Sequence, residues 1–465
     1  MQIINKKDIP ETLTVKIEKM SNLGFGIAKY EGYVIFIPYS CVGDVLKIKL
    51  NKKNKSYAYA DIVEIVEPSK YRVEPFCKMQ KVCGACQFQH IDYEAQLKIK
   101  KQIVEDAMQS IYGDSVEIRD VIKSPKDRAY RYKIQYPITQ TKDSKRIIAG
   151  YYKSKSHDLV NIKYCPIQPS YCDDIIEFIR KACLECGVTG YDESRHTGEL
   201  RHVVIRTSSM NSQSIVVLVV NAKNISNSIS DLAHRIYVEL QNIAGVSINF
   251  NDKITNLILG NKTLTVEGKE FVEETLCDKT FKIAPKTFFQ VNPMTADNIF
   301  KYVKNYIFDN FKKPIILDAY AGITAFGICL SDIASKVVSI EEEEASVKLA
   351  QSIIEENNID NIELNCGDAG EFFANQTSLG RLFDVTILDP PRKGCTQNCL
   401  DYAMKLTKSV IIYVSCNPAT LARDLKYLKG FGADIKYIQP FDMFPHTYHI
   451  ENVAIIEMQK TEAWI

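Results

Sequence analysis

The segment PIILDAYAG, residues 314–322, opens a series of five apolar strands that decides the fold of this chain. The other four are KVVSIE (336–341), NIELNC (361–366), FDVTILDPP (383–391) and SVIIYVS (409–415), with helix-length stretches between them. Near-continuous apolar strands that alternate with helices are typical of a doubly wound parallel sheet, whose ligands bind at the carboxyl ends of the strands. The pattern predicts an α/β Rossmann-like domain with its chemistry at that edge.

Acidic residues end several of these strands. Gly322 permits a tight turn after the first strand, and Glu341 ends the second strand, where an acid can accept hydrogen bonds from both hydroxyls of a ribose. Asp389 ends the fourth strand before two rigid prolines. These positions indicate an adenosine cofactor. Thr324 stands where a dinucleotide binder would carry a second glycine, and nucleotide binding with hydride transfer stays open as an alternative.

A candidate nucleophile and a candidate base follow. Cys416 comes directly after the fifth strand, and a helix that begins after Pro418 would lower the pKa of its thiol. A thiolate adds readily to an electron-poor double bond. Glu451 heads a last apolar strand that can return to the same edge, where a partly buried carboxylate can accept a proton; His446 and His449 are rival bases.

The N-terminal region has a different character. Residues 13–66 form short β-type runs with turn signals between them, which predicts a small OB-like barrel. Residues 1–60 carry ten Lys against five Asp or Glu, a balance that suits contact with phosphate. Basic and aromatic residues that suit nucleic acid are Lys52, Lys53, Lys55, Tyr57 and Tyr59 in the barrel, and Arg131, Lys133 and Arg201 downstream of it.

The bulk composition bounds the class of protein. A chain of 465 residues exceeds the roughly 250–300 residues of one hydrophobic core, so several domains are expected. The N-terminus lacks a signal peptide, and no apolar run approaches the roughly 20 residues of a membrane span. We therefore expect a cytoplasmic protein without membrane contact, in which cysteines stay reduced.

Four cysteines have the spacing of a metal site. Cys77, Cys83 and Cys86 form a C-x5-C-x2-C motif, and Cys165 supplies a distant fourth thiol. Such a set can hold a [4Fe-4S] cluster or a zinc ion, and sequence chemistry does not separate the two. Competing candidates for the fourth ligand are Cys172, Cys183 and Cys186.

Five motifs make the chain resemble a known family. They are KTFFQVN (286–292), LDAYAG (317–322), ILDPPRKG (387–394), YVSCNP (413–418) and HIENVA (449–454). In this order and spacing they resemble the bacterial RNA uridine-5 methyltransferases, and the N-terminal barrel is similar to a TRAM domain.

The resemblance implies a set of roles. It implies that S-adenosylmethionine contacts Gln290, Tyr320, Glu341 and Asp389, that Cys416 attacks a uridine in RNA, and that Glu451 accepts the proton. The family members with this cysteine spacing carry a [4Fe-4S] cluster, which implies that Cys77, Cys83, Cys86 and Cys165 are its ligands.

The resemblance also implies a division of the chain. We expect a TRAM RNA-binding barrel at 1–67, a central α+β RNA-binding domain with the iron-sulfur cysteines at 68–285, whose helix near 93–110 packs on the catalytic domain, and the methyltransferase domain at 286–465. A monomer that acts on 23S rRNA is favoured over one that acts on tRNA. The alternatives are a tRNA uridine-5 enzyme, a cytosine-5 RNA enzyme, and a non-catalytic RNA-binding iron-sulfur protein.

Overall fold

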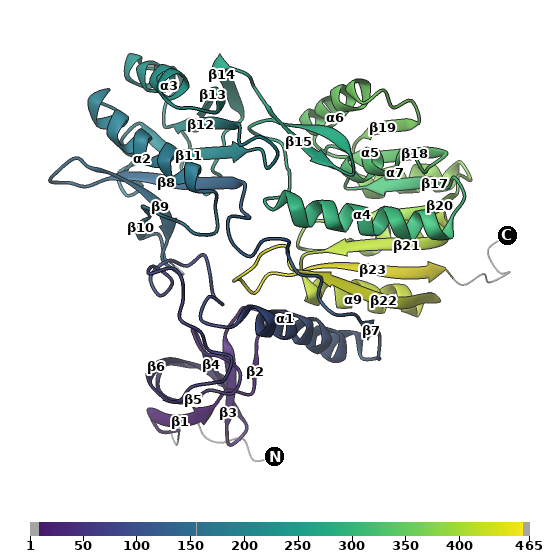
Figure 1. Cartoon of the computed structure of the whole chain (residues 1–465). Coiled ribbons are helices and arrows are strands. Elements are labelled where there is room, and N and C mark those ends of the chain that lie inside the picture. The colour runs from purple at the N-terminus through teal and green to yellow at the C-terminus, as the bar shows by residue number, and fades with distance from the viewer. Residues whose placement is uncertain (1–8, 155, 459–465) are drawn as a thin grey trace.

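The computed structural model describes residues 9–154 and 156–458. Within them, three large sheets and one two-stranded hairpin account for the strands (Figure 1). The first sheet is the N-terminal barrel, the second lies in the central region, and the third is the mainly parallel sheet of the C-terminal region. The predicted multidomain fold class, with a barrel followed by a mixed and then a Rossmann-like module, is confirmed.

The barrel is built from alternating strands. Its six strands, in the order β1-β5-β6-β4-β3-β2, are β1 (Thr12–Lys16), β2 (Lys19–Met20), β3 (Gly26–Tyr30), β4 (Tyr33–Ile37), β5 (Val45–Lys53) and β6 (Tyr57–Glu67). Alternate side chains such as Ile35, Ile37 and Ile48 are fully buried inside it. The buried Asp44 carboxylate accepts hydrogen bonds from Arg72 and from the backbone N–H of Ser69, which fixes the chain as it leaves the barrel.

The central sheet has helices on one face. Its order is β10-β9-β8-β11-β12-β13-β14, with β8 (Lys133–Gln140), β9 (Ile147–Tyr152), β10 (Leu159–Asn161), β11 (Leu200–Thr207), β12 (Ser214–Val220), β13 (Ile243–Phe250) and β14 (Lys262–Gly268). The amphipathic helices α2 (Ser170–Glu185) and α3 (Asn227–Glu239) bury Ile176, Ile179, Leu232 and Ile236 in the same core as the strands.

The C-terminal sheet holds the five predicted strands. These are β17 (Ile315–Ala319), β18 (Lys336–Glu341), β19 (Ile362–Cys366), β20 (Phe383–Leu388) and β21 (Thr407–Ser415), all parallel, followed by β22 (Ala433–Phe441) and β23 (Glu451–Met458). The order β19-β18-β17-β20-β21-β23-β22 reverses direction between β17 and β20, the point at which such sheets bind ligands. Strand β23 lies antiparallel between β21 and β22.

Helices cover both faces of this sheet. Successive strand residues such as Ile411 and Ile412 belong to different cores, as the alternation of side chains in a strand requires. One core includes α4 (Pro293–Asn310), α5 (Ala325–Leu330), α6 (Glu344–Glu356) and the hairpin β15 (Val272–Leu276) and β16 (Lys279–Ile283). The other includes α7 (Ala369–Ser378), α8 (Gln397–Leu406) and α9 (Pro418–Gly430).

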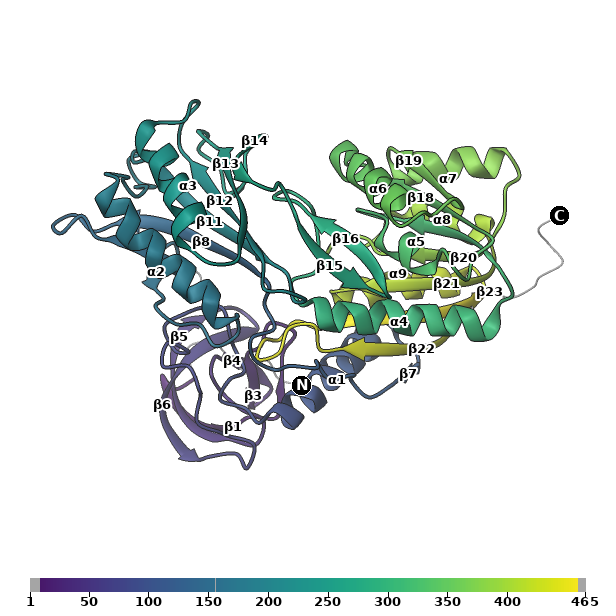
Figure 2. The same cartoon turned by 45° about the horizontal axis from the view of Figure 1, so that its top comes forward.

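Helix α1 (Tyr93–Ala107) connects the barrel to the C-terminal sheet (Figure 2). Its residues Ile99 and Ile103 pack in the barrel core, whereas Val104 and the following Met108 pack in the core of α8 and α9. The short strand β7 (Glu117–Ile118) then pairs with β22 as the outermost strand of the C-terminal sheet. Residues from the interval 68–285 therefore complete the C-terminal module. None of the described helices has the length and apolar character to cross a membrane.

Candidate active site

Cys416 and Glu451 lie beside one another at neighbouring strand ends. Strands β21 and β23 are antiparallel and pair Ser415 with Asn452, so the next residue along β21 and the residue before Asn452 meet at the same edge. The Cys416 side chain is half-buried, whereas Glu451 is only 6% exposed. Antiparallel pairing thus brings together a thiol and a carboxyl that lie far apart in the sequence.

Burial controls the protonation of both groups. It raises the pKa of the Cys416 thiol to about 11, together with the charge of Glu451, while the Arg392 guanidinium acts to lower it. The net shift is therefore opposite to the lowering expected from the following helix. Burial also raises the pKa of Glu451 well above its ordinary value; the Asp389 charge adds to this effect and Arg392 opposes it. Arg392 is therefore the cation that favours ionisation of both candidates. The sequence prediction did not include it, although it stands in the DPPRKG motif.

The turn after β17 carries a series of left-handed residues. Tyr320, Gly322 and Thr324 have φ values of 60°, 57° and 58°. Thr324 thus adopts the conformation that glycine would adopt without strain. The turn therefore has the backbone conformation that the sequence pattern assigns to glycine, although residue 324 is threonine.

The Glu341 carboxylate is held by the same turn. It accepts hydrogen bonds from the backbone N–H of Gly322 at 2.8 Å and of Glu343 at 3.0 Å. Its location at the end of β18 is the one that the sequence predicts for an acid that binds a ribose. The three acids that follow it, at positions 342–344, are exposed.

Two further acids gather at the point where the strand order reverses. Burial raises the pKa of Asp318 to about 7, and the charges of Asp389 and Glu341 contribute to this rise. Burial likewise raises the pKa of Asp389 to about 7. One oxygen of Asp318 accepts from the N–H of Gly327, and the other has no partner among the described residues. The edge thus contains polar groups that a bound ligand could engage.

Gln290 lies to one side of this edge. It precedes the cap of α4 by two residues and lines a small cavity with Tyr132, Lys133 and Arg206 of the central region. Burial and the neighbouring arginines lower the pKa of Lys133 to about 7. Tyr320, Glu341, Asp389, Cys416 and Glu451 share the carboxyl edge of the sheet, whereas Gln290 faces the central region.

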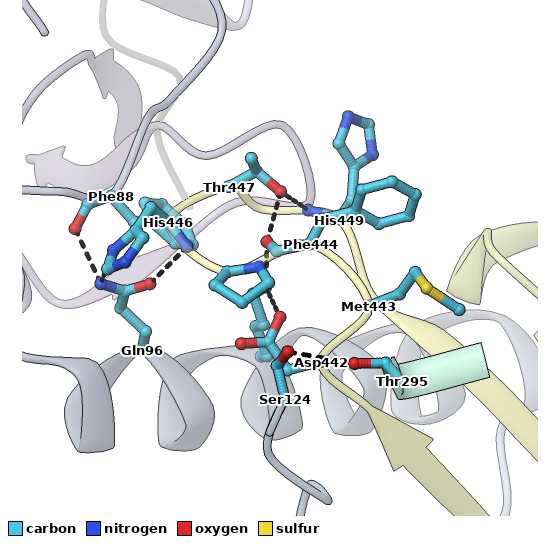
Figure 3. Close-up of polar contacts among 12 residues, drawn as sticks. Phe88, Gln96, Ser124, Thr295, Asp442, Met443, Phe444, His446, Thr447 and His449 are labelled. Atoms are coloured by element: carbon cyan, nitrogen blue, oxygen red, sulfur yellow. Dashed lines mark hydrogen bonds and ion pairs between the residues drawn. The ribbon is translucent and has the colours of Figure 1, made fainter. Parts of the chain in front are cut away.

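The two rival bases are less suited to proton transfer. Burial lowers the pKa of His446 and of His449 to about 4. His446 contacts the Gln96 side chain of α1 (Figure 3), and its Nδ1 lies 3.1 Å from the amide nitrogen of Gln96. His449 Nδ1 lies 3.5 Å from Arg392.

The four predicted metal ligands line one cavity. Cys77, Cys83, Cys86 and Cys165 border it together with Gln89 and Tyr151. The competing thiols Cys172, Cys183 and Cys186 do not line it, since they lie in and at the end of α2. Across the described chain, no group of three or more His, Cys, Asp or Glu side chains is arranged to hold a metal ion, and every cysteine is a free thiol.

One of the predicted RNA contacts is occupied within the protein. The Arg201 side chain is 4% exposed and donates to the backbone carbonyl oxygens of Asn251 and Lys253. The prediction that Arg201 is free to hold a phosphate is therefore wrong, because its guanidinium stabilises the loop after β13.

Comparison with known proteins agrees with these observations. The family model for tRNA (uracil-5-)-methyltransferase matches residues 92–459, and the TRAM-domain model of tRNA (uracil(54)-C(5))-methyltransferase matches residues 13–71. Proteins named uncharacterized RNA methyltransferase from Clostridium tetani and Halalkalibacterium halodurans are 34% and 35% identical; the matches span 97% and 98% of this chain and 98% of each relative.

A solved structure is similar over nearly the whole chain. Pyrococcus abyssi tRNA (uracil-54, C5)-methyltransferase, solved with S-adenosyl-L-homocysteine, has a TM-score of 0.76 and 27% identity, and the match covers 96% of this chain and 100% of that chain. Together with the family-model match, this similarity shows that the chain is an RNA methyltransferase with an N-terminal TRAM domain and belongs to the tRNA (uracil-5-)-methyltransferase family.

Proposed function

We propose that this protein transfers a methyl group from S-adenosylmethionine to carbon 5 of a uridine in RNA through a covalent adduct with Cys416. The observation that carries the proposal is the pairing of Cys416 and Glu451 at adjacent strand ends, next to the acids that end β17, β18 and β20. The S-adenosyl-L-homocysteine bound to the Pyrococcus abyssi protein supports the choice of donor.

Residues of the carboxyl edge would hold the donor. The Glu341 carboxylate, fixed by two backbone N–H groups, suits the ribose hydroxyls. Tyr320 and Asp389 of the same edge, with Gln290 from the side that faces the central region, complete the set that we assign to this site. When bound, S-adenosylmethionine supplies an electrophilic methyl group on a sulfonium. Its positive charge suits an edge at which Asp318, Glu341 and Asp389 are gathered.

Cys416 activates the uracil ring. Carbon 5 of uracil is a weak nucleophile until a thiolate adds to carbon 6 and makes carbon 5 enolate-like. The thiol must first lose its proton, and Arg392 is the charged group that favours the thiolate. Because the target base is stacked or paired in folded RNA, it must be flipped out at a cost of a few kcal/mol.

Glu451 completes the cycle. After methylation, carbon 5 carries one proton too many, and its loss allows the bond between carbon 6 and the Cys416 sulfur to break. A carboxylate whose pKa is raised by burial holds a proton more strongly than an ordinary carboxylate, so Glu451 is a suitable acceptor. The low pKa of His446 and His449 makes both weaker bases.

The RNA substrate has two candidates. We place 23S rRNA first because the chain resembles family members that combine a TRAM barrel with this cysteine spacing. The similarity to a tRNA (uracil-54, C5)-methyltransferase favours tRNA as the second candidate. In both cases RNA would lie across the barrel, the central region and the catalytic edge.

The four cysteines would hold a [4Fe-4S] cluster. Their side chains line one cavity, and four cysteine thiolates are the usual ligands of such a cluster. The Arg131 guanidinium lies within electrostatic reach of Cys86 and Cys165, where it would offset the negative charge of thiolate ligands. Methyl transfer requires no electron, so the cluster would organise the surrounding loops.

Replacement of Cys416 tests the adduct. Wild-type protein with S-adenosylmethionine should form a covalent complex with RNA that contains 5-fluorouridine, because fluorine blocks the loss of the group at carbon 5. Cys416→Ala should form none while it still binds RNA. The control is Cys366→Ala, which removes an exposed thiol of the same domain. An adduct that persists in Cys416→Ala, seen on a denaturing gel, contradicts the proposal.

Alkylation of Cys416 tests the electrostatics of the site. Glu451→Gln removes a neighbouring negative charge, so the pKa of Cys416 should fall and iodoacetamide should react at lower pH. Arg392→Met removes the positive charge, so the pKa should rise and the reaction should need higher pH. The midpoint is measured by mass spectrometry of the Cys416 peptide, with the exposed Cys366 as internal reference. Shifts in the reverse directions would refute this electrostatic assignment.

Iron analysis tests the cysteine site. Anaerobically purified protein should contain about four irons and matching sulfide per chain, and Cys83→Ser should lose most of both. Cys183→Ser is the control, because it removes a thiol that is also buried but does not line the cavity. Stoichiometric zinc in place of iron, or full iron in Cys83→Ser, would exclude the cluster.

Mapping of 5-methyluridine decides between the RNA substrates. Cells without the gene should lack the modification at one or more positions of 23S rRNA and retain it in tRNA. Mass spectrometry of nucleosides from separated rRNA and tRNA fractions measures this. Loss from the tRNA fraction alone would establish the second candidate.

A further inference from the structure

The connection between β22 and β23, residues 442–450, is mostly buried although it contains no helix or strand. We call it the junction loop. It leads directly into Glu451, which pairs with Phe441 across its base. A buried loop must satisfy its backbone polar groups with partners from elsewhere in the protein.

Four consecutive carbonyl groups of the junction loop accept hydrogen bonds from four different segments. The donors are Asn292 at the start of α4 to Met443 O (3.1 Å), Lys100 of α1 to Phe444 O (3.0 Å), the Tyr130 hydroxyl to Pro445 O (2.9 Å), and the Phe88 N–H to His446 O (2.9 Å). The loop is therefore held by the catalytic module, by α1, by the segment that precedes β8 and by the cysteine-bearing segment. Figure 3 shows the loop residues Asp442, Met443, Phe444 and His446 together with Phe88 and with Gln96 of α1.

Two side chains of α1, Lys100 and Gln96, bind this loop at more than one point. Lys100 Nζ lies 2.5 Å from the Asp442 carboxylate at the beginning of the loop, and both side chains are fully buried. One turn earlier on the same face, the Gln96 amide accepts from the His446 N–H at 3.0 Å and its nitrogen lies 3.1 Å from His446 Nδ1. That nitrogen also donates to the carbonyl of Phe88.

His446 takes a conformation that needs such support. Its φ is 64°, a left-handed value that a residue with a side chain adopts at a cost. Bonds from Gln96 to its backbone and its ring hold it there. The path of the chain from His446 to Glu451 thus depends on α1.

The nucleophile is fixed by separate contacts. Asn417, which follows Cys416, caps α9 and donates to the backbone carbonyl of Arg392 at 3.2 Å. These two contacts do not involve α1, although His449 of the junction loop lies 3.5 Å from Arg392. A change at Lys100 or Gln96 should consequently displace Glu451 more than Cys416.

We propose that Lys100 and Gln96 are positioning residues for Glu451: by fixing Asp442 and His446 they set where the Glu451 carboxylate stands relative to carbon 5 of the uridine bound to Cys416. This inference rests on the proposed function. It assigns to α1, which lies between the barrel and the catalytic sheet, an effect on proton removal and not on nucleophilic attack.

Lys100→Met tests the inference in the full-length protein. With 5-fluorouridine RNA, which reports only attack and methyl transfer, the variant should form its adduct at the wild-type rate. With uridine RNA it should stall as the methylated adduct, with product release slowed roughly tenfold to a hundredfold, since a misplacement of about 1 Å can cost a hundredfold in rate. Glu451→Gln is the reference for complete loss of the base. Single-turnover gels measure both species.

Matched variants separate positioning from damage. Lys101→Met removes the neighbouring lysine, whose partner Asp120 is fully exposed, and should leave both rates unchanged. Gln96→Met removes the bonds to His446 without burying an unpaired charge, so it decides the question if Lys100→Met does not fold. Equal slowing of adduct formation and product release, or no slowing of release, overturns the inference. Absence of any adduct in the wild type would instead refute the proposed function itself.

Discussion

The antiparallel pairing of β21 with β23 is the interaction on which the site depends. It places a thiol and a carboxyl side by side, and burial then disfavours the charged form of each. Neither group would ionise readily in such surroundings without a nearby cation, and Arg392 supplies the positive charge for both. A raised pKa suits Glu451, because removal of a proton from carbon needs a strong acceptor. At Cys416 the same burial disfavours the thiolate, so a nearby positive charge must offset it.

The junction loop connects the three modules of the protein. The barrel packs on α1, α1 binds the loop through Lys100 and Gln96, and the cysteine-bearing segment binds it through Phe88. RNA bound to the barrel or the central region would therefore contact modules that are connected to the junction loop. Residues far from Glu451 in the sequence are thus connected, through a short series of buried hydrogen bonds, to the loop that precedes it.

Local signals in the sequence were sufficient for much of the fold. The five apolar strands predicted the parallel sheet, and the acids at the ends of three of them predicted the edge at which Glu341, Asp389 and Cys416 gather. Three features lacked such a signal. The strand β7 has only two residues, Thr324 adopts a left-handed turn without glycine, and Lys100 meets Asp442 across 342 positions of sequence. The contact between Lys100 and Asp442 depends on tertiary packing. In the sequence, Lys100 cannot be distinguished from the other lysines of the same helix. Arg201 illustrates the converse. Its place among basic residues predicted a contact with RNA, whereas its guanidinium donates hydrogen bonds to carbonyl groups of a loop.

A purely stabilising role does not account well for the Lys100 and Asp442 pair. Removing two charges from water costs several kcal/mol per ion, and replacement of a buried ion pair by apolar side chains of similar volume is often neutral or stabilising by about 1–4 kcal/mol. Burial indeed lowers the pKa of Lys100, which is the sign of that cost. An apolar pair makes no directional hydrogen bonds. A leucine or methionine would fill the space without selecting one arrangement of the loop. The ammonium group binds both the Asp442 carboxylate and the Phe444 carbonyl, which fixes the loop at two points. A buried charge at this location makes sense where a precise position is worth more than the stability that it costs, and the loop that it fixes ends at Glu451.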